Sequence, residues 1–452
     1  MIHKYSMSGY NIVLDVESGG VFVMDDLAFK MLDDLGAPMP EKCPNELFEK
    51  FSDYSQDDVK NSYDEIYSLY ASNCMFSDGD INADEYERLV ENSPVKAVCL
   101  NVAHDCNLRC KYCFASTGDF GGGRKLMTLE VAKKAIDFLI ENSGKRRNLE
   151  VDFFGGEPLL NFDVVKKTVE YAKNREKSNN KNFRFTITTN GVLLDDEKIE
   201  YINHHMSNVV LSLDGRREVN DRVRRRVDGS GSYDLILPKF LKLAEGRKDK
   251  DYYVRGTFTK YNLDFVKDVL HINDCGFDQI SVEPVVCDSN CEYAITEEDL
   301  PKIFEQYELL ANKIVEKKKN NHKINFFHFM IDLNQGPCLI KRLKGCGCGN
   351  EYVAISPDGW IYPCHQFMGV EKWNMGNVDE NKLDEKIKEN FSKTTIFHKE
   401  ECKNCWAKFY CSGGCNANNH QYAGNILKPY KIGCEMEKKR IECAIMIKAA
   451  LG

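Results

Sequence analysis

Three thiols lie close together in the stretch Cys106-Asn-Leu-Arg-Cys110-Lys-Tyr-Cys113. The stretch follows an apolar run, residues 97–102, that we expect to form a strand. A structural zinc site needs four closed ligands, usually from two C-x2-C pairs, and this loop has no fourth cysteine. A 4Fe–4S cluster has four iron corners, so three thiolates leave one iron open to a ligand that is not protein. The spacing therefore favours a reactive cluster over part of a zinc ribbon or three buried thiols.

This motif resembles the signature of radical S-adenosylmethionine (SAM) enzymes, in which an aromatic residue, here Tyr112, precedes the last cysteine. The resemblance implies that Cys106, Cys110 and Cys113 hold the cluster and that SAM chelates its fourth iron. It also implies that reductive cleavage of SAM yields a 5′-deoxyadenosyl radical, which abstracts a hydrogen atom from the substrate. In such enzymes the cofactor supplies the chemistry and the protein positions it.

The composition limits the class of protein. At 452 residues the chain is long enough for two or three domains. Its net charge of −9 gives no overall basic field that would attract nucleic acid or an anionic membrane. No run resembles a signal peptide or approaches the length of a membrane span, so we expect a cytoplasmic protein. In that reducing compartment, 19 cysteines indicate metal or cluster ligation rather than disulfides.

Residues 95–330 alternate between strand-like and helical runs. The strand-like runs are 97–102, 149–154, 183–188, 208–213, 253–259 and 279–286. The amphipathic helical runs are 129–141, 164–176, 195–205, 235–244 and 265–275. This order predicts an α/β fold with a parallel sheet and ligands at the carboxyl ends of its strands. Six units suggest a partial (β/α)6 barrel, which is also the fold of the radical SAM family, although the periodicity alone equally permits a doubly wound sheet.

Special residues follow these strands. Gly155-Gly156-Glu157-Pro158 comes after the second strand, where glycines let a ligand approach the backbone and a carboxylate can bind an ammonium group. It resembles the family's GGEP motif, which holds the amino group of SAM. The resemblance extends, position by position, to four further SAM contacts: Asn190, Ser212, Arg224 and Val285. Arg222 is a near rival to Arg224, and turn chemistry offers another explanation for Asn190 and Ser212.

Cysteines crowd again beyond residue 331. The run 402–415 has the spacing C-x2-C-x5-C-x3-C, and Gly359-Trp-Ile-Tyr-Pro-Cys364 precedes it. The run alone permits a zinc site. Together the two motifs resemble the signature of the SPASM extension, which holds two auxiliary 4Fe–4S clusters and would bring the total to three. The resemblance assigns one auxiliary cluster to Cys346, Cys364 and Cys415, with Cys338 or Cys348 as a possible further ligand, and the other to Cys402, Cys405, Cys411 and Cys434.

A histidine, His365, directly follows Cys364. Relatives that oxidise a cysteine or serine of sulfatases carry an acidic base at this position, so the histidine argues against that specific activity. A lone histidine is more often structural. It is nevertheless a candidate catalytic base.

Residues 1–76 are predicted to form a small separate domain. Two β-prone runs, 10–16 and 21–24, are joined by Glu17-Ser-Gly-Gly20 and followed by three helical runs. Any small α+β domain could show this pattern. It resembles the winged-helix-like recognition element of peptide-modifying enzymes, where the leader of the substrate adds as a strand to the sheet edge. The polar, acidic stretch 77–94 is expected to be a linker.

The predicted order is therefore a recognition element (1–76), a linker (77–94), a radical SAM barrel (95–330) and a SPASM domain (331–452). This order resembles radical SAM maturases of ribosomally made peptides, most closely those that form thioethers in six-cysteines-in-forty-five peptides. The resemblance implies an enzyme whose partners are a precursor peptide with its leader and a low-potential electron donor. A carbon–carbon crosslinking maturase, a sulfatase-type formylglycine maturase and a non-catalytic electron carrier remain as alternatives.

Overall fold

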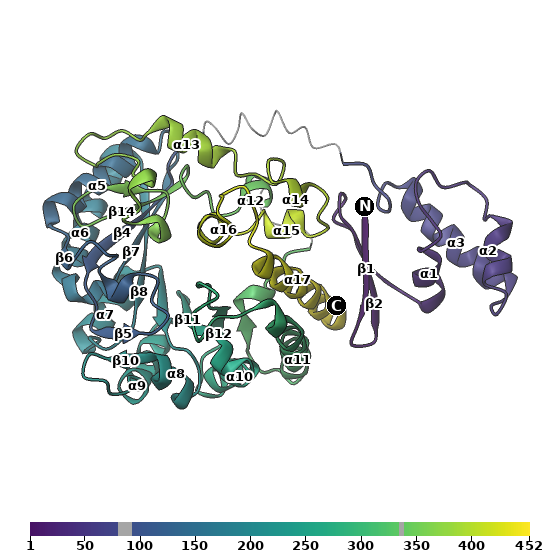
Figure 1. Ribbon diagram of the computed structural model, residues 1–452, viewed down its shortest axis with the longest axis horizontal. Helices are drawn as coiled ribbons and strands as arrows, with labels where there is room; N and C mark the ends of the chain where they lie inside the picture. Colours follow the sequence, from purple (N-terminus) through teal and green to yellow (C-terminus); the bar gives the residue numbers. More distant parts are fainter. Residues whose placement is uncertain (80–92, 334–338) are drawn as a thin grey trace.

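The computed structural model describes residues 1–79, 93–333 and 339–452, drawn as a small N-terminal module beside a larger body (Figure 1). Most of the linker predicted at 77–94 lies outside the described residues, and so does Cys338. Within the described ranges, no helix combines the length and the apolar character that crossing a membrane would require.

The larger body is built on a sheet whose six central strands are the predicted ones. They lie side by side, all parallel and in sequence order: β4 (Ala97–His104), β7 (Asn148–Gly155), β8 (Asn182–Thr189), β9 (Asn208–Ser212), β11 (Asp251–Phe258) and β12 (Gln279–Pro284). A doubly wound sheet would reverse its strand order in the middle. The single direction of winding is instead that of a partial barrel, and the predicted parallel sheet is confirmed.

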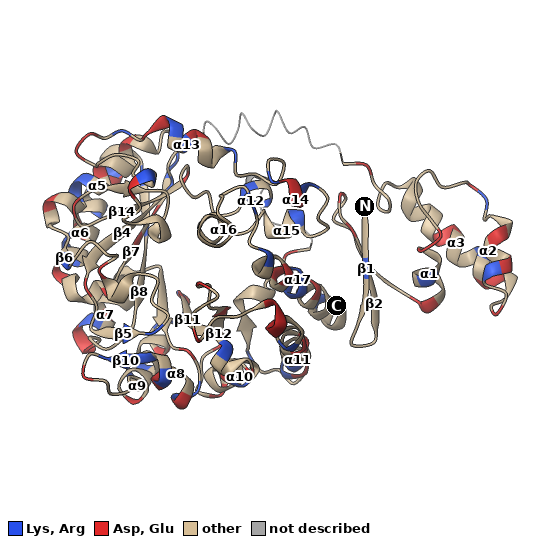
Figure 2. Ribbon diagram, viewed as in Figure 1, with Lys and Arg blue, Asp and Glu red and all other residues tan. Residues whose placement is uncertain are grey.

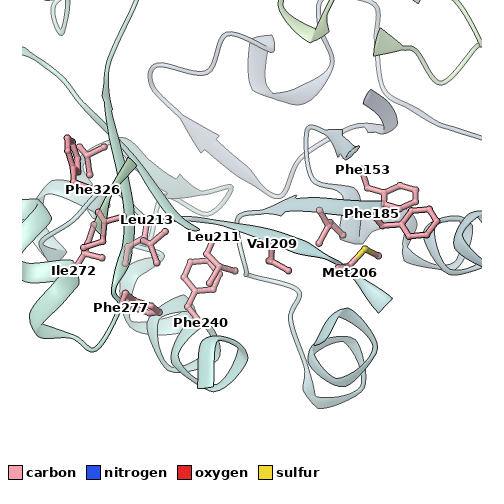
Figure 3. Close-up of a cluster of buried hydrophobic side chains, with 14 of the residues drawn as sticks. Phe153, Phe185, Met206, Val209, Leu211, Leu213, Phe240, Ile272, Phe277 and Phe326 are labelled. Carbon is pink, nitrogen blue, oxygen red and sulfur yellow. The ribbon is translucent and has the colours of Figure 1, made fainter. Parts of the chain in front are cut away.

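Helices cover the outer face of this sheet. They are α5 (Leu129–Asn142), α6 (Phe162–Asn179), α7 (Asp196–His205), α8 (Arg217–Val223), α9 (Tyr233–Glu245), α10 (Val266–Asp274) and α11 (Leu300–Lys319). Successive side chains of a strand point to opposite faces. Figure 3 shows Phe153, Phe185 and Leu211 of three strands in the cluster that also holds Phe240 of α9. The intervening side chains, such as Asp152 and Ser212, face the inside of the barrel and are free to be polar.

Short strands that were not predicted extend the sheet. β13 (Asn325–Phe326) pairs with β12, and β14 (Tyr352–Ile355) pairs with β4, both in parallel. β14 also forms a hairpin with β15 (Ile361–Tyr362), so the C-terminal region joins the edge of the barrel sheet. Runs this short carry little local signal, and the pairing of β14 with β4 joins residues more than 200 positions apart.

The N-terminal module is a three-stranded antiparallel sheet with three helices. Its elements are β1 (Ile2–Met7), β2 (Tyr10–Asp15), β3 (Val21–Met24), α1 (Asp26–Met31), α2 (Asn45–Lys50) and α3 (Gln56–Ala71). The hairpin β2–β3 and the three helices match the predicted runs, whereas β1 was not predicted. Val13 of β2 packs in the module's own core, while Ile12 and Leu14 on the other face belong to the main core.

The last helix, α17 (Lys431–Leu451), holds the module against the body. The Tyr5 hydroxyl of β1 donates a hydrogen bond of 2.8 Å to the Glu442 carbonyl, and the His3 ring stacks on Trp406 at 3.7 Å between centroids. α17 in turn packs against α11. In the strand order β1-β2-β3, β3 forms the edge of the small sheet opposite β1, and its Val23 is 54% exposed.

The rest of the C-terminal region consists of short helices and loops that carry most of the later cysteines. The helices are α12 (Leu339–Lys344), α13 (Glu385–Ser392), α14 (Glu400–Lys403), α15 (Lys408–Cys411) and α16 (Asn416–Ala423). Phe367 and Phe391 form part of a small core that is separate from the core of the barrel.

Candidate active site

A cavity of about 150 Å³ lies where the carboxyl ends of β7, β8 and β9 meet the three-cysteine loop. Nearly all residues that the sequence singled out for the cluster and SAM line it: Cys106, Cys110, Tyr112, Cys113, Gly155, Gly156, Glu157, Asn190, Ser212 and Arg224. The exception is Val285, which follows β12, is buried and donates its backbone N–H to the Phe258 carbonyl. Its contact with the adenine of SAM stays a prediction.

The three-cysteine loop contains a short strand, β5 (Leu108–Cys110), paired antiparallel with β10 (Arg224–Arg226), so Cys110 lies opposite Arg224. Burial raises the pKa of Cys106 to about 11 and that of Cys110 to about 12. A bound metal centre would supply the positive charge that deprotonates such thiols. The donor set therefore suits ligation and gives these two thiols no reactivity of their own.

The spacing of the thiols bears on the choice between a zinc ion and a cluster. Among the residues that the structure describes, no three Cys, His, Asp or Glu side chains lie close enough to share a single metal ion. One zinc ion holds its thiolates at about 2.3 Å from a common centre. The irons of a cluster occupy separate corners and take one thiolate each, which requires wider spacing. The choice of a cluster over zinc stays a prediction from the sequence.

The two glycines after β7 make room for the cysteine loop. A Cβ atom on Gly155 would lie 2.3 Å from the Ala103 carbonyl oxygen, and one on Gly156 would lie 2.2 Å from that of Asp105. Gly155 also has a φ of +129°. The sequence attributed these glycines to the approach of a ligand. In the structure, the chain's own backbone just before Cys106 makes the close approach.

Glu157 is completely buried, and protein donors surround its carboxylate. It accepts hydrogen bonds from the Asn190 N–H at 2.8 Å, the Thr189 hydroxyl at 2.8 Å and the Leu159 N–H at 3.0 Å. Although these hydrogen bonds favour the charged form, burial raises the pKa of Glu157 to about 7. A carboxylate offers about four acceptor positions. One position is left for a ligand, so the predicted contact with an ammonium group remains open to Glu157.

A buried triad of side chains closes the other side of the cavity. The Tyr112 hydroxyl donates to Asp214 at 2.6 Å and accepts from Arg224 Nη1 at 2.7 Å. Arg224 is 8% exposed, and its Nε–H has no hydrogen-bond partner among the described residues. An unpaired donor on a buried cation that lines a cavity fits a carboxylate ligand such as that of SAM. The structure thus favours Arg224 over Arg222, which is exposed and stacks on Tyr261.

Two polar residues on neighbouring strand ends complete the cavity wall. Asn190 donates a hydrogen bond of 2.8 Å to Asn107 and lies 3.6 Å from the Cys106 sulfur, while Ser212 ends β9. Asp214, two residues further on, was missed by sequence reasoning. A carboxylate just after a buried strand was the available signal. The cavity therefore has thiols, a cation and hydrogen-bonding groups that fit a cluster with SAM.

Four C-terminal thiols form a first group: Cys346, Cys348, Cys364 and Cys415. Each pair among them interacts electrostatically. A hydrogen bond from Cys348 lowers the pKa of Cys364. Cys348 and Cys364 are buried, whereas Cys346 and Cys415 are exposed, so the group has one accessible side. Of the two further ligands that the sequence left open, the structure places Cys348 in this group.

The other four thiols, Cys402, Cys405, Cys411 and Cys434, form a second group. Electrostatic interactions link Cys402 to the other three members, and Cys434 to Cys405 and Cys411. Lys399 is fully buried beside both groups, and its ammonium donates to the Gly413 carbonyl at 2.7 Å. Burial lowers the pKa of Lys399, and thiolates of both groups act in the opposite direction. The structure brings these four thiols together, and their ligation of the second auxiliary cluster stays a prediction.

We predict that Cys348→Ala removes the first auxiliary cluster, because Cys348 is the buried fourth thiol of its group. Iron content should fall by about four atoms per chain, as expected for one 4Fe–4S cluster. Iron and sulfide analysis of the anaerobically purified protein measures this. Cys443→Ala is the matched control, since Cys443 is equally buried but belongs to neither group. Unchanged iron in Cys348→Ala would contradict the assignment.

The inside of the barrel carries a charged network that sequence reasoning missed. Arg255 of β11 pairs with Glu283 of β12 at 2.7 Å, and His328 lies 3.9 Å from the same carboxylate. Burial acts to raise the Glu283 pKa, but Arg255 and His328 outweigh it and hold the pKa below its ordinary value. Charged residues at inward positions of otherwise apolar strands were the available signal.

His365 faces the same interior. Its ring lies 4.9 Å from that of Phe154 and 5.4 Å from that of Phe114, two aromatic residues that line the cavity. Burial lowers its pKa to about 4, so the imidazole is neutral at physiological pH. Its Nδ1 lies 3.3 Å from the Tyr352 hydroxyl. Its role as a base stays a prediction.

The chain matches two family models. Residues 100–257 match the radical SAM superfamily, and residues 346–406 match an iron–sulfur cluster-binding domain, SPASM. An uncharacterized protein of Methanocaldococcus jannaschii is 35% identical over 295 residues, which cover 64% of this chain and 91% of that protein. The cysteine-type anaerobic sulfatase-maturating enzyme of Clostridium perfringens is 25% identical over 361 residues, covering 71% and 89%.

Another relative spans more of the chain. The radical SAM cyclopropyl synthase TigE of Paramaledivibacter caminithermalis is 24% identical over 456 residues, which cover 93% of this chain and 89% of that enzyme. Among solved structures, anSMEcpe with bound AdoMet and a peptide superposes with a TM-score of 0.66 at 21% identity, covering 79% of this chain and 99% of that one. The chain therefore belongs to the radical SAM superfamily, as an enzyme with a C-terminal SPASM domain that is related to the sulfatase-maturating enzymes.

Proposed function

We propose that this enzyme installs intramolecular thioether crosslinks, from a cysteine sulfur to a carbon of an acceptor residue, in a ribosomally made cysteine-rich peptide. One observation carries the proposal. A cavity of about 280 Å³ is lined both by Glu283 and Val286 at the end of β12 and by Cys415 and Cys434 of the two thiol groups. A peptide that enters the barrel can thus bring a cysteine next to the accessible side of the first group.

The domain order supports a peptide substrate. We assign residues 1–76 to leader recognition, 77–94 to a linker, 95–330 to the barrel and 331–452 to the SPASM domain. β3 is the edge strand of the small sheet, and its backbone can pair with an added strand. Because β1 and β2 hold the module on α17, a leader bound at β3 would keep its core peptide near the body of the enzyme.

The residues of the main cavity would hold the cofactors. Cys106, Cys110 and Cys113 would ligate a 4Fe–4S cluster, and Arg224 with its unpaired Nε–H would bind the SAM carboxylate. A cluster and SAM bound there supply hydrogen-atom abstraction through a radical. The buried triad of Tyr112, Asp214 and Arg224 would keep SAM oriented and exclude water from one side.

The charged interior of the barrel would orient the acceptor residue. Arg255 and Glu283 form an ion pair and are only partly buried, so both can bind amide groups of a peptide backbone. The neutral His365 ring can accept a proton from a peptide thiol only weakly, because its pKa is about 4. Glu283, whose pKa lies below its ordinary value, is ionised over the whole physiological range.

Carbon–carbon bond formation is the second candidate. The alignment with an enzyme described as a cyclopropyl synthase spans 93% of this chain. The sulfatase-maturating relative covers 71%, which leaves more than a quarter of this chain without a counterpart there. The share of this chain that aligns is larger for the cyclopropyl synthase than for the sulfatase-maturating enzyme. This difference favours a maturase that forms thioethers or carbon–carbon bonds over a formylglycine-forming enzyme.

Mass spectrometry of a candidate cysteine-rich precursor separates these activities. The peptide, with its leader, is incubated anaerobically with reconstituted enzyme, SAM and reductant. For thioether formation we expect a loss of two hydrogens per crosslink, with sulfur retained and one thiol fewer open to alkylation. A precursor without its leader should be modified far less, because β3 then has no strand to bind.

The other outcomes point elsewhere. Loss of two hydrogens with every thiol still open to alkylation would indicate a carbon–carbon bond. Sulfur loss with formation of an aldehyde would indicate sulfatase-type chemistry. Either result would contradict thioether formation while leaving the SAM and cluster site intact.

A further inference from the structure

Two thiols that the proposed function does not use lie on the loop after β12. Cys287 and Cys291 are separated by three residues, and the Cys291 N–H donates a hydrogen bond of 3.0 Å to the Asp288 carbonyl, which folds the segment into a turn. The turn brings the two side chains together, and the thiols share a hydrogen bond. Both are only partly buried. The loop thus carries a pair of neighbouring thiols that a reagent or a substrate can reach.

This loop lies between the three-cysteine loop and the C-terminal region. On one side, Glu292 pairs with Lys111 of the three-cysteine loop at 3.2 Å. On the other side, the Tyr422 hydroxyl of α16 donates a hydrogen bond of 3.2 Å to the Val286 carbonyl. Both thiols of the pair interact electrostatically with Tyr422. The pair is therefore held between the radical SAM cavity and the C-terminal thiol groups.

The thiol pair adjoins the cavity that we assign to the peptide. Val286, the residue before Cys287, lines this cavity together with Tyr430, and Tyr430 interacts electrostatically with Cys287. Figure 2 shows β12, which leads into the loop, on the side of the barrel that faces α16 and α17. A cysteine-rich peptide in the cavity would pass close to both thiols.

The two thiols are not equivalent. Cys287 packs against the main hydrophobic core. Cys291 lies between two exposed residues, Asn290 and Glu292. Burial, and then the neighbouring Cys291, raise the pKa of Cys287 to about 12, so Cys287 keeps its proton at physiological pH. Because the attacking species in disulfide exchange is an accessible thiolate, the geometry favours Cys291 as the thiol that attacks and Cys287 as the one that resolves the intermediate.

We propose that Cys287 and Cys291 form a dithiol that reduces disulfide bonds in the precursor peptide. The inference rests on the proposed function, in which the crosslink forms from a free peptide thiol. Cys291 attacks one sulfur of the peptide disulfide, and the other peptide sulfur leaves as a thiol. Cys287 then attacks the sulfur of Cys291, which releases the second peptide thiol.

The exchange balances within these two partners. Two electrons and the two thiol protons pass from the enzyme to the peptide, and a disulfide between Cys287 and Cys291 remains. A small thiol or dithiol reductant of the cell would reduce this disulfide again for the next peptide.

Disulfide exchange without SAM tests the inference. The reconstituted holoenzyme is freed of added thiols and incubated anaerobically with a synthetic precursor peptide that carries one disulfide. We expect the peptide to gain two hydrogens, while Cys287 and Cys291 lose their reaction with an alkylating agent. Both lie on the tryptic fragment 268–302, where Cys275 should still be alkylated and serves as an internal control.

Single substitutions separate the two roles. Cys287→Ser should trap a mixed disulfide between Cys291 and the peptide, because the resolving thiol is missing. Cys291→Ser should form no such adduct. Either variant should reduce the peptide at least about tenfold more slowly than the wild type. Cys275→Ser, at another partly buried thiol, should match the wild type, and all three variants should keep their iron because none of them removes a thiol of the three groups.

Three results would overturn the inference. The wild type could leave the peptide disulfide intact. Cys287→Ser and Cys291→Ser could both reduce it as fast as the wild type, which would assign the reaction to other thiols. Oxidised glutathione, but not the peptide, could form the bond between Cys287 and Cys291, which would mark a response to the redox state of the cell.

The exchange assay needs no SAM, so its outcome is separate from crosslinking. If the peptide is reduced but never crosslinked, the dithiol inference stands and the proposed function fails. If a reduced precursor is crosslinked but its disulfide form is never reduced, the proposed function stands and the dithiol inference fails.

Discussion

Replacing Cys106, Cys110 and Cys113 together by alanine should reduce SAM cleavage to background. These thiols line the same cavity as the unpaired Arg224 Nε–H, so they are the chain's means of holding a cluster next to SAM. Iron content should fall by about four atoms per chain, the content of one 4Fe–4S cluster. The remaining iron should persist, because no thiol of the two C-terminal groups lines this cavity. Product analysis for 5′-deoxyadenosine and iron analysis measure both effects.

The matched control replaces Cys43, Cys74 and Cys275, which are also partly buried but belong to none of the three thiol groups. This variant should keep its iron and its SAM cleavage. Retained cleavage in the first variant would contradict the assignment of the radical SAM cluster. Loss of all iron would show instead that the three sites do not assemble independently.

Gly156→Ala should have the second largest effect, on both stability and cluster assembly. The added Cβ would lie 2.2 Å from the Asp105 carbonyl oxygen, 2.6 Å from its carbon and 2.9 Å from the Gly118 Cα. All three are backbone atoms that cannot rotate away. Overpacking of this kind typically costs about 1–3 kcal/mol of unfolding free energy. The loop that presents Cys106 must shift, so the radical SAM cluster should be lost as well.

Thermal denaturation and iron content of the same preparations test this prediction. Gly122→Ala is the control in the same region, because its nearest contact is the Asp119 carbonyl oxygen at 3.8 Å and its φ is not in the left-handed region. It should match the wild type in both measurements. If Gly156→Ala also matched the wild type in stability and iron content, the close approach of β7 to the cysteine loop would have no importance for cluster binding.

Periodicity predicted the central sheet well. Each of the six parallel strands begins within two residues of its predicted run, and α5, α6, α7, α9 and α10 match the helical runs. Buried parallel strands and amphipathic helices carry their signal in residues that are neighbours along the chain. Hydrophobic periodicity does not predict the order of the strands in the sheet, and it is this order that excludes a doubly wound sheet.

Short and distant pairings could not be predicted. β5 pairs with β10 across more than 100 residues, and β14 pairs with β4 across more than 200. β1 pairs with the neighbouring β2, but its contact with α17 joins it to the far end of the chain. The strands β5, β10 and β14 have four residues or fewer, so their pairing depends on tertiary contacts rather than on local preference.

The sequence by itself determined the kind of chemistry, because cysteine spacing and glycine-rich strand ends are local features with few chemical meanings. It thus indicated which thiols could ligate clusters and which residues could contact SAM. Only the tertiary structure brought Cys348 together with Cys415, placed Asp214 and Arg224 around Tyr112, and set Arg255 against Glu283 inside the barrel. These contacts join residues on different strands and loops, and folding decides which of many possible partners a buried polar group finds.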